Sequence, residues 1–263
     1  MKPVTKLTIS EAALNRFFAE ARTRLPAAEA MSEINPEQID RFFAEAKRKV
    51  DAAELVDRKL ASGFNVFDLI CPDENRLSDV LKLLLDPRGG HGQGDLFLRL
   101  FLERIHAPQN AKHTKKATVR RESITNRIDN SQRRIDLLVD ATVLLVGIEN
   151  KVNASEQPEQ VKDYLEHLRR WAEARSCRSV LIYLTPDCRP PNSLRSEETR
   201  KAIANKLLIC WDYNEDLRGW LEACRDQCEA PRFNDFLSDF LQYIDQELVR
   251  EQDNDQDLSA YES

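Results

Sequence analysis

Three polar residues at the end of an apolar run could form part of a metal-dependent catalytic site. In "VGIENKV" the apolar residues 146–148 are followed by Glu149, Asn150 and Lys151, so a strand that begins apolar finishes with a carboxylate, an amide and an ammonium. Because side chains alternate along a strand, Glu149 and Lys151 lie on one face and Asn150 on the other. We expect Glu149 and Lys151 to act together, and activity to persist without the Asn150 side chain provided that the protein still folds.

A second carboxylate, Asp136, lies in the preceding run "RRIDLLVDA", and its placement depends on the hairpin register. If the chain turns about positions 142 and 143, Asp136 lies opposite Glu149, with Cβ atoms roughly 5 Å apart. If the turn falls at positions 140 and 141, Asp136 faces Leu145 and no cluster forms. Two carboxylates that close repel unless a divalent cation lies between them, so the first register predicts a cation site.

A third carboxylate, Glu74, precedes an apolar stripe whose spacing predicts a helix from about Asp73 to Leu85. Glu74 lies one turn ahead of Leu77 on the core-facing side. A carboxylate there is costly unless it is paired, hydrogen bonded or bound to a metal. Glu74 could instead complement the helix dipole, a role that Asp73 would fill equally well.

The segment "PEQVKDYLEHLRRWAEA" predicts a helix with Gln160 and Tyr164 four positions apart on one face. Its apolar face consists of Val161, Leu165, Leu168 and Ala172. Gln and Tyr are common at a helix border, so this pair indicates a site only together with the acids.

The order of the predicted elements favours an α/β fold. Helices at about 73–85 and 96–105 precede three strand-like runs within 117–152, then a helix, the strand "RSVLIYLTP", the run "KLLICWDY" and a last helical part at 220–249. An antiparallel meander followed by a helix and a further strand predicts a mixed sheet covered by helices.

Residues 1–62 contain an internal repeat, because "LNRFFAEARTRLPAAEA" matches "IDRFFAEAKRKVDAAEL" further along. Both copies have an apolar stripe with two phenylalanines, which predicts two similar helices. The stripe could pack in the core or form an interface with a second subunit or partner protein. We expect the main domain over residues 63–250 and a disordered acidic tail over 251–263.

The segment from Lys112 to Arg134 is basic, with eight Lys and Arg residues against two acids, although the whole chain has a net charge of −6. This net charge argues against a protein that coats nucleic acid indiscriminately. The segment could face phosphates or form a solvated strand pair. The candidates for phosphate contacts are Lys115, Lys116, Arg120, Arg121, Arg133 and Arg134.

Other classes of protein fit less well. No apolar run reaches the roughly 20 residues of a membrane-spanning helix, and the N-terminus lacks a signal-peptide core, so we expect a cytoplasmic protein. The loop "RGGHGQGD" lacks the Lys-Ser/Thr ending of a P-loop, which argues against nucleotide hydrolysis. The six cysteines include no CxxC pair, so we expect reduced thiols rather than a zinc site.

Together these residues resemble the PD-(D/E)XK nuclease superfamily. The resemblance covers about residues 64–213 and rests on Glu74, Ile135-Asp136, Glu149-Asn150-Lys151, and Gln160 with Tyr164, in that order. The "HGQG" loop, "RIDLLV", "IENKV" and the Q-x-x-x-Y helix are similar to its small stand-alone bacterial branch. Each motif is short, but their joint order is more specific. Ile135 replaces the proline of the name, a position that holds no ligand atom.

The resemblance implies a restriction-endonuclease-like fold and Mg²⁺- or Mn²⁺-dependent cleavage of phosphodiester bonds. By resemblance, the metal-binding groups are the carboxylates of Asp136 and Glu149 and the backbone carbonyl of Asn150, with Glu74 as an accessory acid acting through water. Lys151 matches the catalytic lysine, and Gln160 and Tyr164 match positions that flank the site.

Two functions are compatible with these features. The first is an active nuclease, with DNA as the expected substrate, that serves defence against foreign DNA or DNA maintenance. The second is a non-catalytic module on the same fold that binds nucleic acid or a partner protein. The complete set of two acids and a lysine argues against the second.

Overall fold

The structure, a computed structural model, describes residues 36–61, 63–107, 114–124, 133–152 and 156–248. The chain divides into two compact units, Met1–Phe64 and Asn65–Ser263. In the first unit, helix α2 (Pro36–Leu60) carries the second copy of the repeat. The first copy and the acidic tail lie outside the described residues. Within those residues, no helix is both long enough and apolar enough to span a membrane.

The second unit contains a five-stranded mixed sheet with the strand order β1-β2-β3-β4-β5. The strands are β1 (Thr118–Ile124), β2 (Arg134–Asp140), β3 (Leu144–Asn150), β4 (Arg178–Thr185) and β5 (Leu208–Asp212). The first three pair antiparallel, whereas β3, β4 and β5 are parallel. Parallel neighbours require crossover connections, which here contain one helix each.

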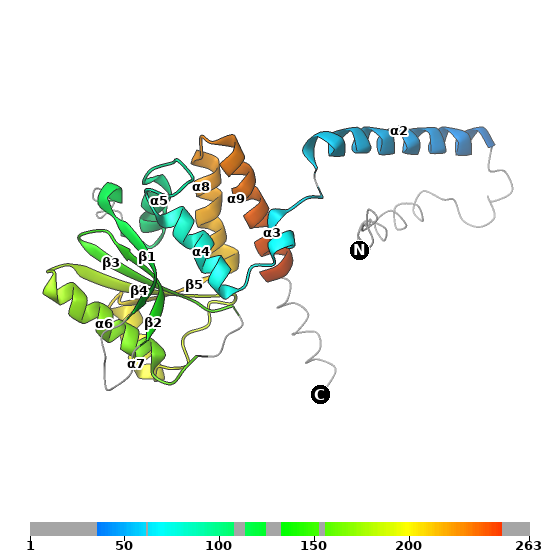
Figure 1. The fold of residues 1–263 in the computed structure, drawn as a ribbon. Coiled ribbons are helices and arrows are strands. Elements are labelled where there is room, and N and C mark those ends of the chain that lie inside the picture. The colour runs from blue at the N-terminus through cyan, green and yellow to red at the C-terminus, as the bar shows by residue number, and fades with distance from the viewer. Residues whose placement is uncertain (1–35, 62, 108–113, 125–132, 153–155, 249–263) are drawn as a thin grey trace, which may run out of the picture. The chain divides into compact units, whose positions relative to one another are not determined.

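Helices cover both faces of the sheet (Figure 1). One face packs with α4 (Glu74–Leu85), α5 (Leu96–Arg104), α8 (Arg218–Gln227) and α9 (Pro231–Tyr243), and the other with α6 (Gln160–Ala174) and α7 (Ser196–Ala204). The short helix α3 (Val66–Ile70) packs on α9, and π-helical turns at Tyr213–Leu217 and Ile244–Leu248 precede α8 and follow α9. Each face of the sheet therefore has its own apolar core.

Strand β3 runs through the middle of both cores, and all seven of its residues are buried. Gly147 permits the close approach of α6, since a Cβ at this position would lie 2.9 Å from Cδ1 of Leu168. A larger residue would force the side chains of Leu168 and Leu181 to shift. This packing brings the first turn of α6 to the polar residues that end the strand.

The β2–β3 hairpin has the register that brings the two acids together. Asp140 pairs with Leu145, and the chain turns at Thr142, whose φ is 70°. The same register, continued along the strands, places Asp136 opposite Glu149. Of the two registers that the sequence permits, the structure has the first.

The mixed sheet, its covering helices and the N-terminal helix confirm the predicted fold class. Two details differ. The last helical part is divided into α8 and α9, because Pro231 starts a new helix rather than continuing the old one. Helix α7 was not predicted, because its charged sequence "SEETRKAIA" has too few apolar positions to show a helical period.

Candidate active site

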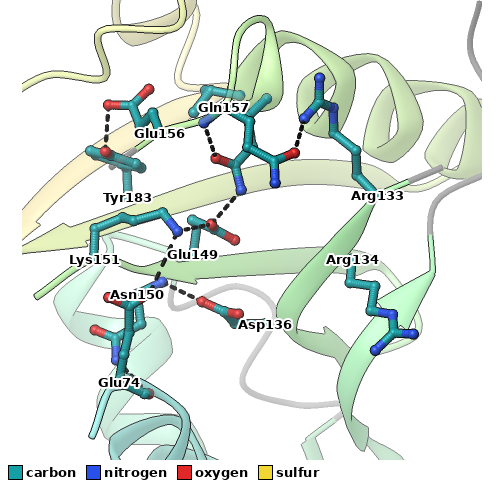
Figure 2. Close-up of polar contacts among 12 residues, drawn as sticks. Glu74, Arg133, Arg134, Asp136, Glu149, Asn150, Lys151, Glu156, Gln157 and Tyr183 are labelled. Carbon is teal, nitrogen blue, oxygen red and sulfur yellow. Dashed lines mark hydrogen bonds and ion pairs between the residues drawn. The ribbon is translucent and has the colours of Figure 1, made fainter. Parts of the chain in front are cut away.

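The candidate site lies at the edge of the sheet where β2 begins and β3 ends (Figure 2). Asp136 lies on β2 and Glu149 on β3. Lys151 is the residue that follows β3, and Glu74 is the first residue of α4. Their polar groups converge from the β2–β3 hairpin and from α4, which lies about 60 positions earlier in the sequence. The structure thus brings together the four charged residues that the sequence singles out.

Glu149 is buried in this cluster, and one of its oxygens has no partner. Its Oε1 lies 2.9 Å from Nζ of Lys151 and accepts a 2.9 Å hydrogen bond from Nε2 of Gln160. Its Oε2 is buried without a hydrogen-bond partner in the described part of the chain. Leaving a buried carboxylate oxygen unsatisfied is costly, so a cation bound there would be stabilised.

Asp136 is held by the neighbouring strands. Its Oδ2 accepts a 2.9 Å hydrogen bond from the backbone N–H of Asn150, and its carbonyl accepts one of 2.8 Å from Nη1 of Arg121. Burial raises the pKa of Asp136, and the Asn150 N–H and the charge of Lys151 only partly offset this. The Asp136 carboxylate is therefore fixed at the end of β3, but the positive charges near it do not offset the effect of its burial.

Helix α4 directs Glu74 at Lys151 because Asp73 caps the helix. The Oδ1 of Asp73 accepts a 2.8 Å hydrogen bond from the backbone N–H of Arg76. Glu74 Oε1 lies 3.5 Å from Nζ of Lys151, and Oε2 accepts a 3.2 Å hydrogen bond from the backbone N–H of Val152. Asp73 supplies the N-cap hydrogen bond of α4, while Glu74 lies in its first turn with both oxygens directed at the residues that follow β3.

Three carboxylates thus share one ammonium. Burial and the charge of Asp136 raise the pKa of Glu149 to about 8, against the opposing effect of Lys151. Burial lowers the pKa of Lys151, but the surrounding acids, Glu149 first, outweigh it and the net shift is upward. Burial is the first cause of the Glu149 shift, and the excess of negative charge adds to it and accounts for the Lys151 shift; a divalent cation would remove that excess.

Helix α6 places Gln160 and Tyr164 beside the cluster. Nε2 of Gln160 lies within hydrogen-bond distance of Glu149 Oε1 and, at 2.8 Å, of the Tyr164 hydroxyl. That hydroxyl in turn donates a 2.6 Å hydrogen bond to the carbonyl of Arg134. The periodicity places Tyr164 on a polar face, yet its side chain is buried in the α6 core. The two residues flank the site by fixing one oxygen of Glu149.

The side chain of Asn150 points away from Glu149, as alternation predicts, but it is not idle. It is fully buried, and its Nδ2 donates to the carbonyl of Glu74 at 3.2 Å and to Oγ of Ser78 at 3.3 Å. Its Oδ1 accepts a hydrogen bond from the Tyr213 hydroxyl. The Asn150 side chain therefore anchors α4 to the end of β3, and the expectation that activity persists without it stays a prediction that depends on folding.

The six basic candidates fall into two groups. Exposed residues are Lys115, Lys116, Arg120 and Arg134. The side chains of Arg121 and Arg133 are each only 15% exposed and form ion pairs with Asp79 and Asp163. Arg133, for example, donates 2.5 Å hydrogen bonds to Asp163 and to the carbonyl of Pro158. The structure favours a structural role for these two, while phosphate binding by the exposed four stays a prediction.

Sequence reasoning missed a further carboxylate beside the site, Glu156 (Figure 2). Its Oε1 accepts hydrogen bonds from the Tyr183 hydroxyl at 2.6 Å and the Asn192 N–H at 2.7 Å, and its Oε2 accepts one from the Ser193 N–H at 2.8 Å. Burial acts to raise the pKa of Glu156, but these hydrogen bonds outweigh it and lower the pKa. No local pattern reveals this role, since the partners lie far along the chain.

A second group of possible metal ligands lies elsewhere in the described residues. The ligand atoms of Cys188, Asp212 and Asp216 all lie within 4.8 Å of one another. However, Asp212 accepts hydrogen bonds from the N–H groups of Glu215 and Asp216, and Asp216 accepts one from the N–H of Asp212. These carboxylates cap the π-helical turn after β5, which accounts for their proximity. The six cysteines are free thiols in the structure.

The sequence of this chain matches a known protein family. Residues 64–242 match a family described as the PD-(D/E)XK nuclease superfamily. No curated protein and no solved structure matches the chain. The matched segment covers more than half of the chain and includes every residue of the candidate site and the whole sheet. The chain therefore belongs to the PD-(D/E)XK nuclease superfamily.

Proposed function

We propose that this protein is a nuclease that hydrolyses phosphodiester bonds in DNA with Mg²⁺ or Mn²⁺. The observation that carries the proposal is the buried Glu149, whose Oε2 has no described partner, beside Asp136 and Lys151. Buried acids with too few partners destabilise a fold, and strongly perturbed acids of this kind cluster at functional sites. Membership of the superfamily supplies the reaction class.

The donor set fits a divalent cation that prefers oxygen ligands. Carboxylates favour Mg²⁺ or Mn²⁺ over zinc. The oxygens of Glu74, Asp136 and Glu149 do not all lie within 4.8 Å of one another, and Lys151 lies between Glu74 and Glu149. We therefore assign the metal to Asp136, Glu149 and the backbone carbonyl of Asn150, with Glu74 acting through a water.

The protein groups divide the remaining work. When bound, the divalent ion would neutralise charge on the phosphodiester and make the attacking water more acidic. Lys151 keeps its proton among the surrounding acids and stabilises the charge that develops on phosphorus. Gln160 donates a hydrogen bond to Oε1 of Glu149, so Oε2 is the oxygen that can bind the ion. The Tyr164 hydroxyl accepts a hydrogen bond from Gln160 and donates one to the carbonyl of Arg134, which links Gln160 to the start of β2.

Labelled single- and double-stranded DNA and RNA, incubated with the protein and Mg²⁺, test this function. We expect the wild type to cut DNA and Asp136→Asn to lose more than about 100-fold in rate, since even changes around a metal ligand cost 10–100-fold. Asp140→Asn is the matched control, because Asp140 ends the same strand and pairs with Arg175 at 2.5 Å. A wild type that cuts none of these substrates with either metal would favour the non-catalytic binding module.

We also propose that the exposed basic residues contact the phosphate backbone. They are Lys115, Lys116, Arg120 and Arg134. Replacing all four with Gln should weaken DNA binding regardless of sequence and flatten its salt dependence by roughly 0.9 in slope for each lost contact. Lys201→Gln is the control, because Lys201 is exposed on α7 and pairs with Glu197. An unchanged salt slope would contradict the proposal.

The proposed setting is the cytoplasm, in defence against foreign DNA or in DNA maintenance. We further propose that the repeat-containing region 1–62, of which the structure describes α2, packs on the nuclease domain or binds a second subunit or a partner protein. The support is the apolar face of α2, where Phe42 and Phe43 are 54% and 64% exposed. Light scattering of the double variant Phe42→Ser, Phe43→Ser should show a smaller assembly than the wild type if the partner is a second copy.

A further inference from the structure

The side chain of Arg121 lies between two elements that each supply an acid to the candidate site. Its Nε donates to Oδ1 of Asp79 at 2.8 Å and its Nη2 to the carbonyl of Asn75 at 3.1 Å, both on α4. Its Nη1 donates to the carbonyl of Asp136 on β2 at 2.8 Å. One guanidinium thus joins the residue after Glu74 to the backbone of Asp136.

The preceding residue on β1, Arg120, provides an internal comparison. Arg120 pairs with Leu138 and Arg121 with Leu137, so alternation directs the two side chains to opposite faces of the sheet. Arg120 is exposed, and its guanidinium lies 5.3 Å from the centroid of the Trp171 ring on α6. The two residues have the same charge and adjacent positions, but only Arg121 contacts α4 and the backbone of Asp136.

The shape of the guanidinium suits this position. Its donors point in fixed directions within one plane, so three different acceptors can be held at once, whereas the ammonium of a lysine has a single nitrogen. At 15% exposure the side chain of Arg121 is also partly shielded from water, which strengthens its hydrogen bonds. Movement of α4 relative to β2 would break at least one of them.

We propose that Arg121 is a positioning residue that fixes Glu74 and Asp136 relative to each other. The relevance of this role to catalysis rests on the proposed nuclease function, but the role itself can be measured without it. Three successive amides report on it. The N–H of Asn150 donates to the Asp136 carboxylate, that of Val152 donates to the Glu74 carboxylate, and that of Lys151 donates to the carbonyl of Leu184 in the sheet.

Amide hydrogen exchange, resolved by NMR, tests the proposal on the full chain. In Arg121→Gln, the amides of Asn150 and Val152 should exchange at least about tenfold faster, while that of Lys151 keeps its protection. Arg121→Lys should recover part of the loss, and Arg120→Gln should leave all three amides unchanged. Equal acceleration of all three amides would mean general destabilisation and would overturn the proposal, as would no change at Asn150 and Val152.

A Mg²⁺ titration of the same variants separates this role from the function. Arg121→Gln should weaken Mg²⁺ binding by about tenfold or more, as residues behind metal ligands do, and Arg120→Gln should bind like the wild type. If the wild type neither binds Mg²⁺ nor cleaves, the proposed function fails while the exchange result still decides the positioning role. If Arg121→Gln does not fold, Asp79→Asn can replace it, because this variant weakens only the contact between Arg121 and α4. The exchange rate of the Val152 amide should then increase more than that of the Asn150 amide.

Discussion

Glu149 and Glu156 lie near the same edge of the sheet, but their surroundings differ. Both oxygens of Glu156 accept hydrogen bonds, from the Tyr183 hydroxyl and two backbone N–H groups. Glu149 has one oxygen engaged by Lys151 and Gln160 and the other buried without a described partner. Accordingly, the pKa of Glu156 is lowered, whereas burial and Asp136 raise that of Glu149 to about 8.

The difference shows how a carboxylate that supports the fold can be distinguished from one that is held for chemistry. Glu156 gains from folding, because every oxygen exchanges water for a protein donor. On folding, Glu149 loses its bound water, but only one of its two oxygens gains protein partners. The nearby charges of Asp136 and Glu74 also repel it. A bound cation would reverse that balance for the ionised group, whereas without one the raised pKa favours uptake of a proton. The same residue type therefore has opposite effects on stability at two nearby positions.

The largest expected effect is that of Glu149→Gln. Cleavage should fall by more than about 100-fold, because the variant loses a metal ligand. In metal-free buffer above about pH 8, where Glu149 is ionised, its melting temperature should match or exceed that of the wild type, because the substitution then removes a buried charge beside two other acids. Mg²⁺ should raise the melting temperature of the wild type but not that of the variant. Cleavage assays and thermal melts with and without Mg²⁺ measure each of these.

The same isosteric change at Glu156 is the control. Glu156→Gln should lower the melting temperature in metal-free buffer and keep the stabilisation by Mg²⁺. The comparison breaks if Glu149→Gln melts several degrees below the wild type without metal and still cleaves, because Glu149 would then support the fold rather than the reaction.

A smaller effect, on stability, is expected from Asn150→Ala. Asn150 lies next to Glu149 but resembles Glu156, since its buried side chain is fully hydrogen bonded to Ser78, Tyr213 and the carbonyl of Glu74. Truncation leaves buried partners unsatisfied and should reduce the free energy of unfolding by about 2–3 kcal/mol. Urea denaturation measures the loss, with Asn205→Ala, exposed at the end of α7, as the control. Equal stability of the two variants would refute the anchoring role.

Local sequence patterns predict most of the charged cluster. Alternation places Glu149 and Lys151 together, and helical spacing places Glu74 at the start of a helix, because both rules depend only on neighbouring residues. The hairpin register is harder, since the sequence permits two turns. Thr142 takes the left-handed conformation that determines the actual turn, which is unusual for a β-branched residue and cannot be expected from its type.

The contacts that hold the cluster in place could not be predicted, because their partners are distant in sequence. Arg121 binds Asn75 and Asp79, more than forty positions earlier, so charge alone suggests a phosphate contact. Alternation predicts the face on which the Asn150 side chain lies, but not that α4 and Tyr213 meet it there. Such contacts follow from the packing of helices on the sheet, which no local period encodes.

The smallest effect concerns the contribution of Glu156 to stability and its dependence on pH. A folded-state pKa below the unfolded value of about 4.3 means that the ionised group stabilises the fold above that pH, and that this stabilisation is lost as the pH falls through the folded pKa. Glu156→Gln should therefore be less stable than the wild type near pH 7, by about 1 kcal/mol because the group is partly exposed. Urea denaturation between pH 7 and pH 3 should show this gap closing on acidification. In the control Glu159→Gln, whose carboxylate is 64% exposed and pairs with Lys162, the change should stay below about 0.5 kcal/mol at every pH. A gap that widens in acid would show that the hydrogen bonds to Glu156 do not favour its charged form, and the contrast with Glu149 would then lose its physical basis.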